Sequence, residues 1–483
     1  MAVYLAVDLG TTGCRSILFD SDLHQISDSY REYGLITPRD KWVEQDARLW
    51  WELTKETARE AIGKSGVRSE EIKGMSVSSQ GITLVPVDRE LNPLYNALSW
   101  LDVRAESQAK RIERDFGFPQ MYQLTGKTID AAYFLPKILW LREEKPEIYN
   151  KTWKFLMPMD FLIAKLTGNC VTDHSMASGT LLYDMKNKVW SREVLKKYEL
   201  GEEQLPELRW GGEKAGMLLP EAAKELGLSV DCAVAVGAQD QRCASLGVGL
   251  RKGVVTISLG TAGSICKYWD ELKIEEGSKI GWSAYINENS WVTEGVVNTA
   301  AACLRWVRDT MFPGCGYDTI NLEAEEAAQR GSKALFYPYL EGAGCPDYYE
   351  EAEGCFYGLS LAAKRGDFAL AVMEGIAFQI RIILEKMKAY EDVHTVVLFG
   401  GGAKSALWCQ IIADVTGLEI QVPVTPEAAG AGAAVLAGIA AEEFSRQEPP
   451  VLARDKTYRP GAGQEKMQQK YERYRSKEYK FWR

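Results

Sequence analysis

Two stretches of the chain share one pattern of apolar and polar positions. The first runs from apolar residues 3–7 through Asp8-Leu9-Gly10-Thr11-Thr12-Gly13 into a second apolar segment that ends at Asp20. This pattern predicts a strand, a tight turn and another strand, and the glycines leave backbone N–H groups of the turn open to an anion. Residues 254–263 repeat the pattern and contain Ser258-Leu259-Gly260-Thr261-Ala262-Gly263. One short match is weak evidence, but two copies about half a chain apart favour an internal duplication, with a nucleotide held between two related domains.

Elsewhere the periodicity predicts strands that alternate with helices, which indicates an α/β protein. Residues 3–35 are expected to form antiparallel strands, and Asp46 is expected to cap the helix that follows. We place a close hinge between domains at 1–246 and 247–483, because no Pro/Gly/Ser-rich linker marks a join. In the second domain the expected elements are helices over 298–311 and 406–415, a final strand over 419–422, and a charged helix with a solvated face over 464–481.

Composition narrows the class of protein. The formal net charge is −10, and Lys and Arg form no separate basic block, which argues against general nucleic-acid binding. The longest weakly polar stretch, 428–441, is too short to cross a bilayer, so we expect a helix packed closely on a sheet. Met1 leads directly into the first strand, so we expect no secretory signal and a cytoplasmic protein. The ten cysteines contain no C-x-x-C pair, which favours reduced, structural cysteines.

The chain has only three histidines, so any general base is expected to be a carboxylate. Asp240 is the candidate. It follows the apolar run 233–236 and a small-residue turn near the predicted hinge, and ligands of α/β proteins bind outside the carboxyl ends of strands. Asp240 could equally cap the helix that begins at Gln241. The sequence leaves both roles open, and they can coexist.

Two further positions suggest ligand contacts. Asp8 lies at a strand end, where its carboxylate can hold a hydrated divalent cation. Gly400-Gly401-Gly402 follows the apolar strand 396–399 and precedes a helix, so a flat ring could lie against this backbone. The alternative for the glycines is a turn that needs unusual dihedral angles.

Together these motifs resemble the FGGY family of carbohydrate kinases, within the superfamily of actin, Hsp70 and hexokinase. The resemblance covers essentially all of residues 3–440. It implies an α/β fold of two duplicated actin-like, ribonuclease H-like domains, each with a mixed central sheet, and an active-site cleft between them. The matching segments are the two phosphate motifs at 8–13 and 258–263, the adenosine motif at 400–405, the second family signature at 354–359 and 367–374, and the first signature at 135–141, where Phe134 replaces a small residue or Pro.

Within the family the chain is most similar to the xylulokinases, through segments 42–46, 172–184 and 407–411. One site departs from them. After the glutamine that corresponds to Gln80, xylulokinases usually have Met-His and glycerol kinases have Arg-Glu, whereas this chain has Gly81 and Ile82. These residues line the substrate pocket in relatives. The resemblance therefore implies a ketopentose-like sugar, with another ketose or a polyol (ribulose, glycerol or erythritol) as the alternative.

The resemblance also implies a role for individual residues. The γ-phosphoryl group of ATP would pass to a sugar hydroxyl whose proton Asp240 accepts, while Asp8 orients Mg²⁺ through water. An exposed aspartate, with a pKa near ~3.9, is a weak base for this step. The implied nucleotide contacts are Thr11, Thr12, Arg15, Gly260, Thr261, Ala301, Arg305, Gly401 and Gly402. The implied sugar contacts are Gln80, Gly81, Ile82, Trp100, Asp102, Tyr133, Asp240 and Gln241.

The expected partners are thus ATP and a small sugar or polyol, without nucleic acid or membrane, and a homodimer is the assembly to test. Two other classes share part of the pattern. An actin- or Hsp70-like non-metabolic ATPase would use both hairpins but would need neither Asp240 nor the second signature, and its ADP release would not depend on sugar. A catalytically silent sugar sensor is disfavoured, because no motif position for chemistry is missing.

Overall fold

The two glycine turns occupy corresponding places in two central sheets. The computed structural model describes residues 2–275 and 277–478. The first sheet has the strand order β13 (Lys214–Met217), β14 (Ala233–Ala235), β5 (Ile72–Ser79), β1 (Val3–Leu9), β2 (Gly13–Asp20), β3 (Gln25–Glu32), and β15 (Ala238–Gln239) also pairs with β5. The second has the order β18 (Gly281–Ala284), β19 (Trp291–Val297), β17 (Gly263–Trp269), β16 (Val254–Leu259), β22 (Thr395–Phe399), β23 (Glu419–Pro423), β24 (Arg454–Tyr458).

The strand pairing is the same in both sheets. β1 pairs antiparallel with β2 and parallel with β5, and β16 pairs in the same way with β17 and β22. Each turn is closed by its first glycine, which donates its N–H across the turn: Gly10 to the Gly13 carbonyl at 2.9 Å, and Gly260 to the Ala262 carbonyl at 3.1 Å. The predictions of a duplication and of mixed sheets are confirmed.

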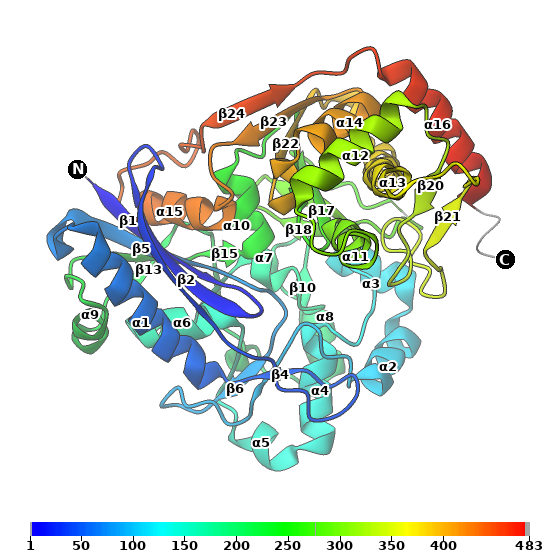
Figure 1. Cartoon of the computed structure of the whole chain (residues 1–483). Coiled ribbons are helices and arrows are strands. Elements are labelled where there is room, and N and C mark those ends of the chain that lie inside the picture. The colour runs from blue at the N-terminus through cyan, green and yellow to red at the C-terminus, as the bar shows by residue number, and fades with distance from the viewer. Residues whose placement is uncertain (1, 276, 479–483) are drawn as a thin grey trace.

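Helices cover both faces of the first sheet (Figure 1). Successive side chains of β1 point to opposite faces, as in any strand. Leu5 belongs to a core that includes Trp50 of α1 (Ala47–Ser65) and residues of α6 (Pro158–Thr167). Tyr4 and Ala6 belong to a different core, which includes α10 (Asp240–Gly247) and α15 (Ala428–Ala440). The weakly polar stretch therefore forms a helix on a sheet, as predicted, but the sheet is that of the first half of the chain.

Glycine lets α10 and α15 approach closely. A Cβ added at Gly432 would lie 1.8 Å from the carbonyl oxygen of Cys243, and one at Gly247 would lie 2.3 Å from that of Ala428. The core around these helices also contains Val254 and Phe399 of the second sheet. The helix pair therefore lies between the two sheets and contacts both.

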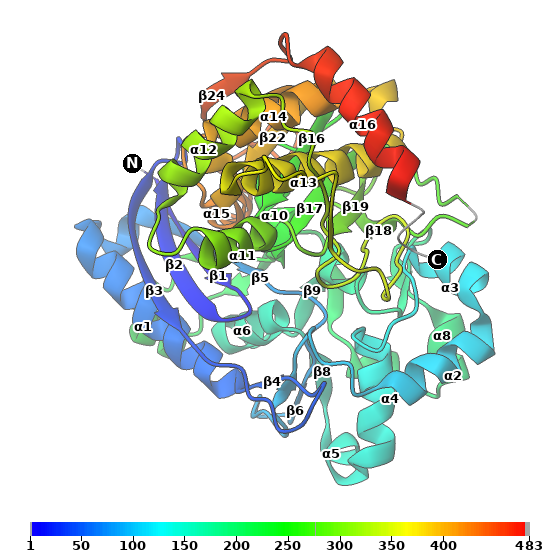
Figure 2. The same cartoon turned by 45° about the vertical axis from the view of Figure 1, so that its right-hand side comes forward.

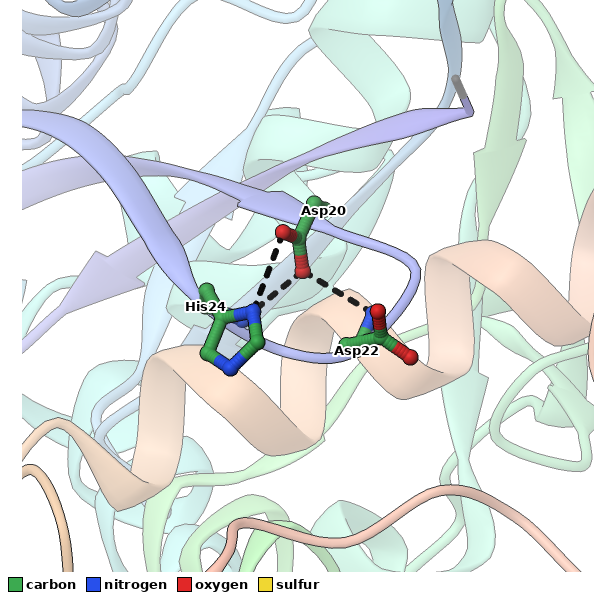
Figure 3. A group of neighbouring side chains, drawn as sticks. All are labelled: Asp20, Asp22 and His24. Atoms are coloured by element: carbon green, nitrogen blue, oxygen red, sulfur yellow. Dashed lines mark hydrogen bonds and ion pairs between the residues drawn. The ribbon is translucent and has the colours of Figure 1, made fainter.

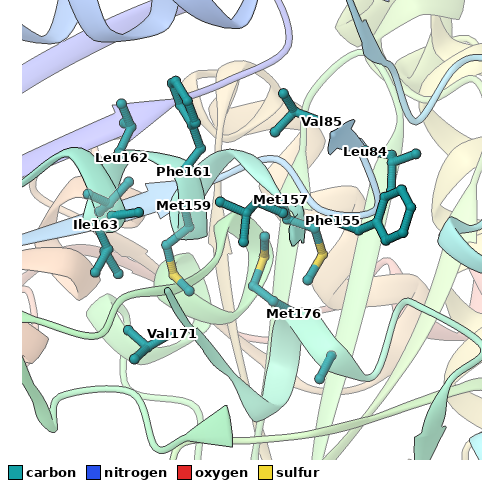
Figure 4. Packing of buried hydrophobic residues seen from close by; sticks show 14 of the residues in the cluster. Leu84, Val85, Phe155, Met157, Met159, Phe161, Leu162, Ile163, Val171 and Met176 are labelled. Atoms are coloured by element: carbon teal, nitrogen blue, oxygen red, sulfur yellow. The ribbon is translucent and has the colours of Figure 1, made fainter. Parts of the chain in front are cut away.

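The rest of the first half extends from the sheet as short elements (Figure 1). Buried residues such as Leu84, Phe155 and Met157 belong to the same core as Phe161 of α6, which joins this layer to the sheet (Figure 4). The helices are α2 (Glu106–Phe116), α3 (Phe118–Thr125), α4 (Phe134–Glu144), α5 (Pro146–Lys151), α7 (His174–Ala177), α8 (Arg192–Lys197) and α9 (Pro220–Leu226). The strand pairs are β4 (Glu44–Gln45) with β7 (Ala97–Leu98), β6 (Val85–Val87) with β8 (Lys154–Leu156), β9 (Val171–Asp173) with β12 (Glu207–Arg209), and β10 (Tyr183–Asp184) with β11 (Val189–Trp190).

The second half corrects two predictions. The strand over 419–422 is not the last one, because β24 follows and pairs antiparallel with β23. Helix α16 (Gln464–Glu478), at the outer edge in Figure 2, is not only a solvated face. It buries Met467, Tyr471 and Tyr474, an i, i+4, i+7 stripe that the surrounding charges obscure in the sequence. Residues 479–481 of the predicted helix lie outside the described residues.

The other helices of this half are α11 (Ala301–Met311), α12 (Tyr317–Gln329), α13 (Arg365–Lys386) and α14 (Ala406–Thr416), and β20 (Leu335–Tyr337) pairs with β21 (Cys355–Tyr357). Short 3₁₀ helices lie at Ser69–Glu71, Glu202–Gln204, Ala389–Glu391 and Gly401–Lys404. Within the described part of the chain, no helix combines the length and the apolar character that a membrane span requires.

Candidate active site

The carboxyl ends of three parallel strands bring the two predicted acidic residues to one edge of the first sheet. Asp8 on β1 lies opposite Ser78 on β5, and Ser78 lies opposite Ala238 on β15. Helix α10 then begins at Asp240. The Ser78 hydroxyl donates to Oδ1 of Asp8 at 2.9 Å. This edge is where ligands bind in α/β folds.

Both carboxylates have raised pKa values. Burial is the main cause for Asp240 and raises its pKa to about 7, with the charge of Asp8 adding to the effect. Burial likewise raises the pKa of Asp8 to about 6, although the Ser78 hydrogen bond opposes the shift. Asp240 is thus a stronger base than an exposed aspartate. Because the two carboxylates disfavour each other's charge, a divalent cation would stabilise the ionised pair, and oxygen donors suit Mg²⁺.

The helix cap is Gln239, not Asp240. Oε1 of Gln239 accepts hydrogen bonds from the backbone N–H groups of Gln241 at 3.1 Å and of Arg242 at 3.3 Å. Asp240 uses Oδ1 to accept from the Gln241 N–H at 2.7 Å. Among the described residues, no group hydrogen-bonds to Oδ2 of Asp240, so that oxygen can accept a proton from a ligand. The sequence did not indicate Gln239, because Ser, Thr, Asp and Asn are the usual caps.

The predicted phosphate residues Thr11, Thr12, Gly260 and Thr261 lie in the two hairpin turns, and all four reach the surface. The turn of the second hairpin is anchored to the start of α11, because the Ala301 N–H donates to the Gly260 carbonyl at 2.9 Å. The backbone at both turn tips is therefore held in place.

Arg15 lies opposite Asp8 on the neighbouring strand, and its charge lowers the pKa of Asp8. Its guanidinium also pairs with Glu427 at 2.5 Å, just before α15. Arg15 is thus near the predicted cation site, and its guanidinium also pairs with Glu427, a carboxylate of the second half.

A cavity of about 390 Å³ supports the adenosine assignment. It brings together Ala301, Gly401 and Gly402, as predicted, whereas Arg305 is exposed on α11 and does not line it. A Cβ at Gly401 would meet no atom within 4 Å, so the backbone there is open to a ring. The sequence did not indicate the contribution of α12, because no motif marks it. The remaining lining residues are Leu304, Tyr317, Asp318, Asn321, Lys404, Ser405 and Trp408.

Two predicted sugar contacts, Asp102 and Gln80, are buried in this structure. Asp102 has no exposed surface, and its carboxylate accepts from the Val43 N–H at 2.6 Å and pairs with the Arg104 guanidinium at 2.7 Å. Gln80 is only 2% exposed. Its Nε2 donates to Oε1 of Gln45 at 2.8 Å, and its Oε1 accepts from the Thr83 hydroxyl at 3.3 Å. Both side chains are engaged with partners inside the protein.

The other predicted sugar contacts reach the surface: Gly81, Ile82, Trp100, Tyr133, Asp240 and Gln241. Ile82 has a φ of 49°, which is unusual for a β-branched residue. The ammonium of Lys137 holds its carbonyl at 3.2 Å and that of Ser99 at 2.7 Å. Lys137 is fully buried on α4 and was not among the predicted residues.

Arg242 and Glu294 were also missed. Arg242 is 2% exposed, and it extends from α10 into the second sheet. Nη1 of Arg242 lies 3.1 Å from Sγ of Cys266, and Nη2 pairs with Glu294. The Ser264 hydroxyl completes the site by donating to Glu294 at 2.5 Å. The charge of Glu294 contributes to the raised pKa values of Asp240 and Tyr133, which indicates that the three groups lie in one region.

A different acidic group does not belong to this site. Asp20, Asp22 and His24 lie in the turn after β2, so they are at the opposite end of β2 from Gly13 (Figure 3). Oδ1 of Asp20 accepts from the backbone N–H groups of Asp22 and His24, both at 2.9 Å. These bonds shape the turn itself.

Comparison with known proteins decides the family. A sequence model of the FGGY family of carbohydrate kinases, N-terminal domain, matches residues 3–247, and that of the C-terminal domain matches residues 255–441. The chain belongs to the FGGY family of carbohydrate kinases. This FGGY kinase is 32% identical to the xylulose kinase of Bacillus subtilis (strain 168) over 451 residues, which cover 93% of this chain and 90% of that one. It is 28% identical to the gluconokinase of the same organism over 446 residues, 89% of this chain and 86% of that one.

Solved structures agree with this assignment. The xyloylose kinase from Brucella ovis superposes with a TM-score of 0.90 at 29% identity, covering 98% of both chains. The FGGY kinase is therefore an enzyme that transfers a phosphoryl group to a sugar hydroxyl, and membership of a kinase family implies use of ATP. The predictions of family, fold class and kinase activity are confirmed, and a metabolic kinase is favoured over an actin- or Hsp70-like ATPase.

Proposed function

We propose that this FGGY kinase transfers the γ-phosphoryl group of ATP to a hydroxyl of a ketopentose, with xylulose as the first candidate. The observation that carries the proposal is the placement of Asp240 beside Asp8 at the strand ends next to the first phosphate hairpin. The likeness to xylulose kinases over most of the chain supports the choice of sugar.

Asp240 acts as the general base. With its pKa raised to about 7 by burial, the carboxylate is a better proton acceptor near neutral pH than an exposed aspartate. The acceptor oxygen bonds to phosphorus, the bond from the γ-phosphorus to the bridging oxygen of ADP breaks, and the hydroxyl proton passes to Oδ2 of Asp240. In a loose transition state most of the proton transfer follows the phosphoryl transfer.

The other residues position the reactants. Asp8 would hold Mg²⁺, which when bound neutralises charge on the phosphates. Thr11, Thr12 and Thr261 offer backbone N–H and hydroxyl donors from the two turns, and Gly260 leaves the backbone beside Thr261 without a side chain. The cavity between α11, α12 and Gly401-Gly402 takes the adenosine. Because phosphoryl transfer depends mainly on positioning and charge stabilisation, these fixed donors account for most of the catalysis.

The sugar side is formed by Gly81, Ile82, Trp100, Tyr133 and Gln241. An apolar side chain at position 82 lacks the imidazole that xylulokinases present there, so the sugar can differ from D-xylulose. The proposal also places the boundary between the domains near residue 246 and the enzyme in the cytoplasm. Light scattering would test whether it assembles as a homodimer.

The deciding experiment is a coupled ADP assay with Mg·ATP across ketopentoses, ketohexoses, gluconate, glycerol and erythritol. We expect one ketopentose to give the highest kcat/KM and ADP release without sugar to be negligible. A polyol or gluconate with the highest kcat/KM would overturn the choice of sugar. ADP release that ignores all added sugars would overturn the kinase mechanism itself.

A further inference from the structure

A closed ring of hydrogen bonds joins the first phosphate hairpin to the loops of the proposed sugar side. Nε2 of Gln45 donates to the Thr11 carbonyl at 2.6 Å, and Oε1 of Gln45 accepts from Nε2 of Gln80 at 2.8 Å. Oε1 of Gln80 accepts from the Thr83 hydroxyl at 3.3 Å, which in turn accepts from the Trp100 N–H at 3.1 Å. The Trp100 indole N–H closes the ring on Oγ1 of Thr11 at 2.9 Å.

The bonds of the ring have a consistent direction. Trp100 donates from its backbone N–H and from its indole N–H, and the two series of hydrogen bonds that start at these groups both end on Thr11. Gln45 fits in one orientation only, because a flipped amide would set its oxygen against the Thr11 carbonyl and its nitrogen against Nε2 of Gln80. Oγ1 of Thr11 accepts the indole N–H, so its own hydroxyl proton stays available for a phosphate oxygen.

The residues of the ring differ in burial, because those in the middle are buried and those at the two ends are exposed. Gln45 and Thr83 have no exposed surface and Gln80 is 2% exposed, whereas Trp100 is 40% exposed. Thr11 also reaches the surface. A buried amide without a hydrogen-bond partner costs the full free energy of its desolvation. The buried residues therefore favour the arrangement in which all bonds of the ring are made.

The backbone on both sides of the ring is fixed. The Gln80 N–H donates to the Leu9 carbonyl at 3.0 Å, which ties the start of the Gln80 loop to β1. Lys137 holds the carbonyls of Ile82 and Ser99, which directly precede Thr83 and Trp100. Trp100 is therefore linked to Thr11 twice, directly through its indole N–H and indirectly through Thr83, Gln80 and Gln45.

We propose that Gln45 is a positioning residue that couples the phosphate hairpin to the sugar loops, so that nucleotide and sugar bind synergistically. The inference rests on the proposed function, in which Thr11 faces the phosphates and Trp100 faces the sugar. A ligand bound at either end stabilises this arrangement of the ring and so favours the geometry that the other ligand binds. Linkage requires the effect to be reciprocal: sugar strengthens nucleotide binding by the same factor by which nucleotide strengthens sugar binding.

The test compares Gln45→Met with Gln108→Met. Gln108 is a matched control, because it is 3% exposed and its amide donates to Glu143 at 2.7 Å on a different face of the first half. Calorimetry gives the Kd of Mg·ADP with and without the sugar that is turned over best, and the Kd of that sugar with and without Mg·ADP. We expect the wild type and Gln108→Met to share a coupling factor of about 5-fold or more, and Gln45→Met to lower it, because only the direct bond between Trp100 and Thr11 then remains.

A purely structural role for Gln45 predicts a different pattern. Both variants would lose thermal stability, and the coupling factor of the folded protein would not change. An unchanged factor in Gln45→Met, or a wild-type factor of 1, would overturn the inference while leaving the proposed function intact. A wild type without sugar-dependent ADP formation would instead overturn the proposed function, and the inference with it.

Discussion

The pKa of Asp240 depends more on its surroundings than on its residue type. Burial and the neighbouring Asp8 raise its pKa to about 7, whereas an isolated aspartate titrates near ~3.9. In its proposed role as the base, Asp240 is active when ionised. The wild-type kcat/KM should therefore fall as pH drops below about 7, and a cation bound at Asp8 would shift this fall to lower pH.

Asp240→Asn removes the proton acceptor and keeps the shape of the side chain. We expect kcat to fall roughly 10²–10⁴-fold, the usual value of general-base help, while the Kd of Mg·ADP stays within about 2-fold. The coupled assay and calorimetry measure the two quantities. Asp22→Asn, in the exposed turn after β2, is the control and should match the wild type. Turnover of Asp240→Asn near the wild-type rate would exclude Asp240 as the base.

Ile82 combines an unusual backbone conformation with a side chain that we propose contacts the sugar. A β-branched side chain at a φ of 49° is strained, and His tolerates this region better. Ile82→His should therefore fold without loss of stability and supply a hydroxyl partner. We expect kcat/KM for D-xylulose to rise about 2- to 10-fold, the value of one hydrogen bond, relative to the other ketopentoses. An unchanged substrate profile would show that position 82 does not contact the sugar.

His174 links pH to stability. It is buried, stacks on Trp210 with ring centroids 3.8 Å apart, and its Nδ1 lies 2.8 Å from the Tyr183 hydroxyl. Burial lowers the pKa of His174 from 6.5 to about 4. Between these values only the unfolded chain binds the proton, so His174 reduces the free energy of unfolding as pH falls from about 6.5 to about 4, by roughly 3 kcal/mol in all.

Urea unfolding between pH 4 and pH 7 measures this effect. His174→Gln should lose part of the wild-type decline in stability at acid pH, whereas His24→Gln, in an exposed turn, should keep it. Parallel pH profiles for the wild type and His174→Gln would contradict the assignment.

At the scale of elements, the sequence was most informative where function is encoded locally. A glycine turn after an apolar run specifies the hairpin, so residues 8–13 and 258–263 could be placed from the amino-acid pattern alone. The cap of α10, the stripe of α16 and the contribution of α12 to the cavity beside Gly401 could not be predicted in this way. Each depends on which distant segment packs nearby. The same holds for Gln80 and Asp102, whose polar side chains look available in the sequence but are used by Gln45 and Arg104.

The contact between α10 and α15 makes a prediction at this scale. Gly432→Ala places a methyl group against the Cys243 carbonyl, so α10 and Asp240 must move. We expect a loss of about 1–3 kcal/mol in the free energy of unfolding and a lower kcat. Gly63→Ala, in an open position of α1, is the matched control and should gain about 0.5–1 kcal/mol. Equal effects of the two substitutions would show that the helices do not need the close approach.

At the scale of the whole molecule, both halves of the chain contribute to the surroundings of α10, the helix that begins at Asp240. α15 returns from the second half to cover the first sheet, and α10 sends Arg242 into the second sheet. The free energy that holds Asp240 in place is therefore not local to either half. A description of two independent lobes with a hinge at residue 246 omits this exchange, because a linear pattern does not show which sheet a helix covers.

The ion pair of Arg242 and Glu294 tests how strongly the halves depend on each other. Glu294→Gln leaves the Arg242 guanidinium buried and unpaired, which should cost about 3–5 kcal/mol in the free energy of unfolding and lower kcat. Arg242→Met combined with Glu294→Gln removes the stranded charge and should recover part of that loss. Asp270→Asn is the control, because its pair with Lys252 is exposed and is worth at most about 1 kcal/mol. If urea unfolding showed Glu294→Gln to cost no more than Asp270→Asn, this ion pair would not contribute to holding the halves together, and Gly432→Ala would then be the more damaging substitution.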